Sequence, residues 1–132
     1  MTETFFQYRS LVQLLQQSQT LRLLRSGHAA MSISFLHKMF RQANTLAVPL
    51  AELTQKLADY LANIGFLEEG EEQQTLSYIS SDYYERADTY LKRWADEENR
   101  FIFINMDEKT HEPYVTITRH TEKAFQALEL LR

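Results

Sequence analysis

The stretch from residue 90 to residue 118, YLKRWADEENRFIFINMDEKTHEPYVTIT, constrains the fold most, because its hydrophobic period changes along its length. It begins on a helical pattern that includes Leu91 and Trp94. Apolar residues then follow the strand-like pattern of two short segments, 101–106 and 114–118, around a polar tip. Thr118 can cap a further helix. The stretch therefore predicts a helix, a β-hairpin and a second helix in direct succession.

Upstream of this stretch, apolar residues recur every three or four positions, which is the spacing of one helical face. The segment 28–42 is apolar almost all round, as is typical of the central helix of a domain. Gly27 follows a helical pattern and can supply a left-handed C-cap, and Gly65 closes the helix that begins at residue 50. The predicted elements are helices over 5–15, 21–24, 28–42 and 50–64, with a short extended segment at 46–48.

A short strand, two helices and a hairpin, in this order, are typical of a winged-helix domain, here with an extra helix in front and one behind. Asp82 and Glu85 fit a capping box that opens the helix 82–100. The acidic segment 66–80 is interpreted as a solvated connection. The predicted fold is mainly α, of the α+β class: a winged-helix domain over 1–118 with an extra N-terminal helix and a two-stranded wing hairpin. Residues 119–132 are predicted to begin a following helix or linker, because no stop signal precedes Arg132.

Composition narrows the class of protein. A chain of 132 residues is one domain by the usual prior, and the absence of cysteine excludes disulfides and thiolate chemistry. No apolar run approaches the length that spans a bilayer, and the N-terminus lacks the layout of a signal peptide. The sequence therefore predicts a cytoplasmic protein with no membrane partner.

The side chains that could carry chemistry do not form a site. His28 and His37 would lie on opposite sides of one helix, and His111 and His120 have no partner at metal-ligand spacing. The acidic run 68–72 lacks the alternating pattern of a calcium loop. The three glycines are scattered singly, which leaves no phosphate-binding loop and no nucleophile elbow. We therefore predict no enzymatic activity, no metal and no cofactor.

The charge pattern bears on nucleic acid. The net charge is −4, but residues 1–45 contain five basic residues and one acidic residue. The helix 82–100 is itself acidic, which disfavours groove reading because phosphate contacts need Arg or Lys. A winged-helix DNA-binding transcriptional regulator remains the alternative function. Candidates for non-specific contact with the DNA backbone are Arg22, Arg25, Lys38 and Arg41, although solvated basic faces are the favoured explanation of these residues.

The first hairpin strand is apolar on both sides. Phe101 and Phe103 point to one side and Ile102 and Ile104 to the other, whereas an isolated wing should be polar on its outer side. Either the final helix or a second chain should therefore cover the second side. The adjacent pair Phe5-Phe6, on different helical faces, raises the same question. The predicted protein interface comprises Phe5, Phe6, Ile102 and Ile104.

Three runs of the sequence together resemble a known family. They are LVQLLQQSQTLRLLRSGHAAMSISFLHKMF, YLKRWADEENRFIF and YVTITRHTEKAFQALELL. In order and spacing they are similar to the N-terminal region of JetA-like proteins, the kleisin subunits of the Wadjet plasmid-defence complexes, which resemble MukF-type kleisins of bacterial condensins. The resemblance covers nearly the whole chain and is weakest over 66–80.

This resemblance implies a role that the residues alone do not give. It implies a non-catalytic, architectural domain that homodimerises and helps to assemble an SMC complex that restricts plasmid DNA. The implied partners are a second copy of the chain, an SMC-type ATPase subunit, an accessory kleisin-binding subunit and, through the complex, plasmid DNA. The implied location is the cytoplasm, in association with the nucleoid or with plasmids.

Overall fold

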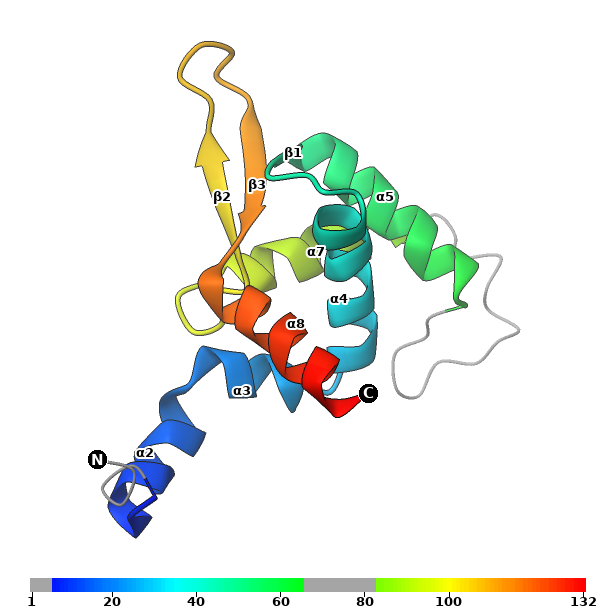
Figure 1. Ribbon diagram of the computed structural model, residues 1–132. Helices are drawn as coiled ribbons and strands as arrows, with labels where there is room; N and C mark the ends of the chain where they lie inside the picture. Colours follow the sequence, from blue (N-terminus) through cyan, green and yellow to red (C-terminus); the bar gives the residue numbers. More distant parts are fainter. Residues whose placement is uncertain (1–5, 66–82) are drawn as a thin grey trace.

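The computed structural model describes residues 6–65 and 83–132, and in these ranges the chain is mainly helical with one small sheet (Figure 1). The elements, in chain order, are α2 (Tyr8–Gln17), α3 (Gln19–Leu24), α4 (Ala29–Leu36), the π-helix η1 (His37–Gln42), β1 (Val48–Pro49), α5 (Leu50–Asn63), α7 (Tyr83–Ala95), β2 (Ile102–Met106), β3 (Pro113–Ile117) and α8 (Arg119–Leu131). This order confirms the predicted mainly α, α+β class.

The central helix is formed by α4 and η1 together. Met31, Phe35, Leu36 and Phe40 are all buried, which confirms the central position predicted for 28–42. The last six residues, however, adopt π geometry. The amide of Thr45 closes this π turn by donating to the carbonyl of Phe40 at 3.0 Å. The apolar pattern did not predict this widening of the helix.

Helices α5 and α7 pack against each other and supply much of the core. α5 buries residues at helical spacing, among them Leu53, Leu57 and Leu61, which confirms the predicted amphipathic helix. Gly65 follows this helix, as predicted, and with φ of 63° it is in the left-handed conformation. Gly27 does not share this role: among the glycines that the structure describes, only Gly65 has a positive φ, so the cap predicted at Gly27 is wrong.

Helix α7 ends at Ala95, five residues before the end that was predicted for it. The Asp96 carboxylate accepts from the amide of Asn99 at 2.9 Å, and the Asn99 side chain donates to the carbonyl of Arg93 at 2.8 Å. These two bonds replace the helical pattern by a turn, because Asp and Asn side chains compete for backbone groups.

The sheet is antiparallel, with the strand order β1-β3-β2. The hairpin runs from Ile102, paired with Ile117, to Met106, paired with Pro113, within one residue of both predicted strands. β1 contributes only two residues to the other side of β3, where Val48 pairs with Val115. The hairpin projects beyond the helices (Figure 1).

At the base of the hairpin, the carbonyl group just before β2 bonds to the start of α8. The Phe101 carbonyl accepts from the Thr118 amide at 3.3 Å, from the Thr118 hydroxyl at 3.3 Å and from the Thr121 hydroxyl at 2.7 Å. Thr118 also caps α8, as predicted, by accepting from the Thr121 amide at 3.4 Å. Phe125 of α8 is buried in the same core as α4 and α5. The boundary predicted after residue 118 therefore does not separate two packing units.

Three predictions concern residues outside the described ranges: Phe5, the connection 66–80 and the capping residue Asp82. Within the described ranges, no helix has the length and apolar character needed to cross a bilayer.

Candidate assembly surfaces

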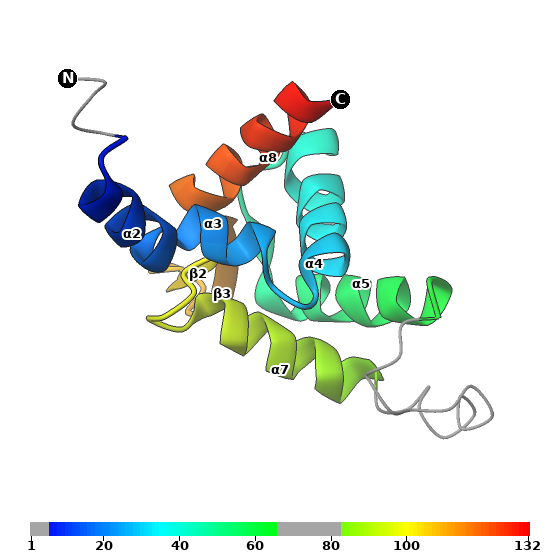
Figure 2. The ribbon, with the colours of Figure 1, turned by 90° about the horizontal axis from the view of Figure 1, so that it is seen from below.

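Helix α2 carries an apolar face that the rest of the chain leaves largely uncovered. None of its ten residues is buried. Leu15 is 51% exposed and Leu14 is 38% exposed, while Leu11 and Val12 are half-buried. Figures 1 and 2 show α2 at the outer end of α3, projecting away from α4, α5 and α7. A helix of this length is marginal in water by itself, because helix formation needs tertiary packing.

The junction with α3 fixes where α2 begins to project. Ser18 is extended, with φ of −74° and ψ of 118°, and its hydroxyl caps α3 by accepting from the Leu21 amide at 3.2 Å. α3 is in turn attached to α8, because the Thr20 hydroxyl donates to the carbonyl of His120 at 2.9 Å. Among the residues that the structure describes, the body of the domain therefore holds α2 mainly at its end next to α3.

The β-hairpin is the second candidate surface, and its burial changes along the strand. Phe101 and Ile102 are buried at the base, whereas Phe103, Ile104 and Met106 are 45%, 36% and 60% exposed. The prediction placed Ile102 and Ile104 together at a protein interface. Ile102 is 0% exposed within its own chain, so its side chain cannot take part in a surface contact in this conformation. Ile104 stays a prediction.

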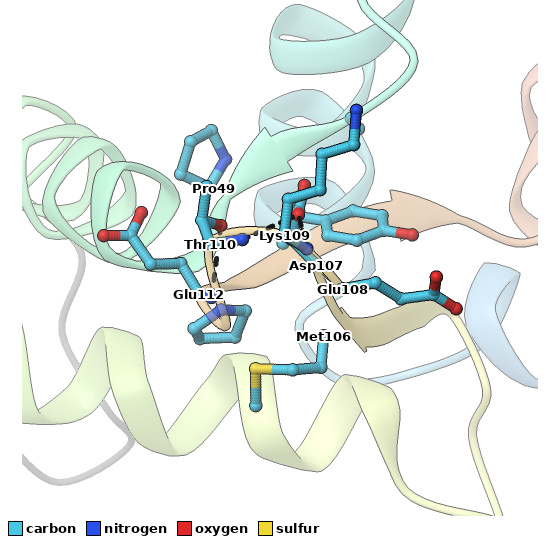
Figure 3. A pocket seen from close by; sticks show the side chains of 10 residues that line it. Pro49, Met106, Asp107, Glu108, Lys109, Thr110 and Glu112 are labelled. Atoms are coloured by element: carbon cyan, nitrogen blue, oxygen red, sulfur yellow. Dashed lines mark hydrogen bonds between the residues drawn. The ribbon is translucent and has the colours of Figure 1, made fainter.

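The tip of the hairpin, residues 107–112, is ordered by one carboxylate. Asp107 accepts from the amides of Lys109 at 2.8 Å and Thr110 at 3.1 Å. The bonds from Thr110 and Lys109 hold the pKa of the Asp107 carboxyl below its usual value. Beside this tip, an open hollow lies between Met106 and Pro49 (Figure 3). The tip thus presents fixed acidic charge in an otherwise solvated loop.

A third surface is an apolar groove between α4 and α8, which the sequence did not predict. Small side chains, Ala29 and Ala30, lie along one side, and Phe125 and Leu128 line the other. Glu129 and Arg132 also line the groove. The prediction missed it because its two sides are about 100 residues apart in the sequence. Only the packing of α8 brings them together.

One family model covers most of the chain. The family model described as "Protein of unknown function (DUF3375)" matches residues 13–132. The chain belongs to this family. No curated protein and no solved structure matches it.

Three of the four basic residues predicted to touch DNA already contact groups of the same DUF3375 domain. Arg22 donates to the carbonyl of Glu98 at 3.2 Å, and Arg41 pairs with Glu129 at 3.3 Å. The Lys38 ammonium lies 5.6 Å from the centre of the Tyr60 ring. Arg25 is exposed. These contacts lie at three separate places, so they do not form a ready-made basic patch.

Two of the four histidines of the DUF3375 domain are also engaged in packing. His28 lies edge-on to Tyr90, with ring centres 5.4 Å apart, and His37 lies edge-on to Phe125 at 5.1 Å. Over residues 6–65 and 83–132, no three His, Asp or Glu side chains gather where they could hold a metal ion. Any proposed function therefore has to explain mainly the apolar surface that the described residues leave uncovered.

Proposed function

We propose that this chain is a winged-helix, kleisin-type domain of a non-catalytic subunit, which dimerises and helps to assemble an SMC complex that restricts plasmid DNA. The family resemblance noted in the sequence is the source of the SMC-type ATPase, the accessory subunit and plasmid DNA as partners. The order β1, α5, α7, β2, β3 is consistent with a winged-helix domain that has additional helices at both ends.

The observation that carries the assembly role is the uncovered apolar face of α2. Burial of a Leu side chain contributes about 1.5–3 kcal/mol. Leu14 and Leu15, which are 38% and 51% exposed, would each regain part of this free energy in a contact between two copies, and the exposed Phe6 and Tyr8 would add to it. An N-terminal helix attached mainly at one end is also well placed to reach a second copy.

The distribution of acidic residues supports a role in protein assembly rather than the binding of α7 in the major groove of DNA. Asp96, Glu97 and Glu98 are exposed immediately after α7, and Glu108 and Glu112 are exposed at the hairpin tip. Both regions would face phosphates if α7 entered a major groove, and like charge there opposes binding. Protein partners carry no such uniform negative charge. Sequence-specific DNA binding is therefore not part of the proposal.

Light scattering after size-exclusion chromatography tests the assembly role at micromolar concentration. The expected mass is twice the 15.6 kDa of one chain. We expect Leu15→Glu to return the protein to the mass of one chain, because the new carboxylate would be buried in the contact. The matched control is Gln13→Glu, which adds the same charge about 160° around α2 and should remain a dimer. A wild-type protein that stays monomeric throughout this range would refute the proposed dimer.

A further inference from the structure

A small polar pocket lies where the start of α4 meets α7 and the segment before β2, and we call it the α4–α7 pocket. Its volume is about 230 Å³. Pockets that hold drug-sized ligands have roughly 300–1,000 Å³, so this one suits a single small group. None of the residues that line it is acidic, although acidic side chains outnumber basic ones in the chain. The lining therefore favours an anion.

Two side chains with nitrogen donors line this pocket from different elements. Arg93 comes from α7, and His28 is the N-cap of α4. No carboxylate of a described residue pairs with the Arg93 guanidinium, which lies 5.9 Å from the centre of the Tyr90 ring. A guanidinium is always charged and matches the geometry of a phosphate group. The start of α4 adds the positive end of a helix dipole at the same place.

Ser32 is a buried polar side chain whose hydroxyl is not used within the protein. It is 2% exposed and lines the same pocket. In the described parts of the chain, its hydroxyl has no hydrogen-bond partner. The Ser26 hydroxyl, which also lines the pocket, instead donates to the Leu23 carbonyl at 3.0 Å. Because buried polar groups are normally hydrogen-bonded, the Ser32 hydroxyl points to a partner from outside the chain.

We propose that the α4–α7 pocket binds one phosphate group, held by the Arg93 guanidinium, the His28 ring and the Ser32 hydroxyl. A phosphate group has several acceptor oxygens, so it can satisfy donors that reach it from α4 and α7 at the same time. The group can belong to a small molecule or to the backbone of DNA. Its binding is independent of the proposed dimer and adds a ligand site to the assembly role.

The fluorescence of Trp94 reports whether the pocket is occupied, because Trp94 lines it and the chain has no other tryptophan. We expect inorganic phosphate at millimolar concentration to change this fluorescence until it saturates. Sodium chloride at the same ionic strength should leave the fluorescence unchanged, since chloride cannot accept from all three donors in the same geometry.

Arg93→Gln tests the charge. We expect this variant to bind inorganic phosphate roughly 10- to 100-fold more weakly, because a charge-assisted hydrogen bond is lost. The matched control is Lys92→Gln, which removes the same charge from the neighbouring position. Lys92 does not line the pocket and pairs with Asp88 at 2.8 Å, so phosphate binding should persist. Both side chains are exposed, and thermal melting should show that both variants keep the fold.

Ser32→Ala tests the buried hydroxyl. The smaller side chain fits the same space, and we expect phosphate binding to weaken roughly 2- to 10-fold through the loss of one neutral donor. Ser34→Ala is the control on the same helix: Ser34 lies outside the pocket and bonds to Tyr60, so its loss should leave phosphate binding unchanged.

A second titration, with a short DNA duplex, distinguishes the two sources of the phosphate group. Duplex binding that Arg93→Gln abolishes and Lys92→Gln keeps would identify the DNA backbone as the source. A response to inorganic phosphate alone would identify a small molecule. No saturable response to either ligand, or equal losses of affinity in Arg93→Gln and Lys92→Gln, would overturn the phosphate site and leave the proposed dimer standing.

Discussion

Helices α5 and α2 have similar amphipathic patterns and opposite surroundings. α5 buries five of its fourteen residues, and α2 buries none of its ten. α5 packs against α7 on one side and the sheet on the other, whereas α2 meets the chain mainly at α3. An apolar stripe in the sequence therefore shows that a helix needs a covering surface. It does not show whether the same chain or another chain provides that surface.

The largest effect should come from the covered helix. We expect Leu57→Ala to lower the free energy of unfolding by about 2–5 kcal/mol, because Leu57 is fully buried and truncation leaves a cavity. Urea denaturation followed by circular dichroism measures the change. A loss below 1 kcal/mol would show that α5 is less essential to the core than its burial indicates.

The end of α5 should have a smaller effect. Gly65→Ala places a side chain on a backbone with φ of 63°, at a cost of about 1–2 kcal/mol, although no atom within 4 Å obstructs the new methyl group. Gly27→Ala is the matched control, since Gly27 has equal space and no positive φ. Thermal melting of both variants separates backbone strain from packing: equal melting temperatures would contradict the assignment.

The smallest effect on the single chain should come from α2. We expect Leu15→Ala to change the free energy of unfolding by less than about 0.5 kcal/mol at a concentration where the protein is monomeric. At higher concentration the same variant should become less stable than the wild type, because dimerisation stabilises only the folded state. A large loss at every concentration would mean that α2 is covered by its own chain after all.

The sequence predicted the helices and the hairpin well, because both depend on local periodicity and caps. It failed for features that depend on which residues pack together in the folded chain. Alternation along β2 assigned Ile102 and Ile104 to one side, but it could not show that the core ends between them. Apolar spacing likewise does not distinguish π from α geometry over 37–42, and the groove between α4 and α8 exists only after packing.

The attachment at Phe101 has a mechanical consequence. The hairpin and α8 share one carbonyl as a joint, and that carbonyl accepts from the amide of Thr118 and from two threonine hydroxyls. A force applied along α8 would therefore reach both strands of the hairpin at its buried end, β3 through the covalent chain at Thr118 and β2 through the Phe101 carbonyl. The Phe101 carbonyl thus makes β2 follow any displacement of α8 that the covalent chain passes to β3.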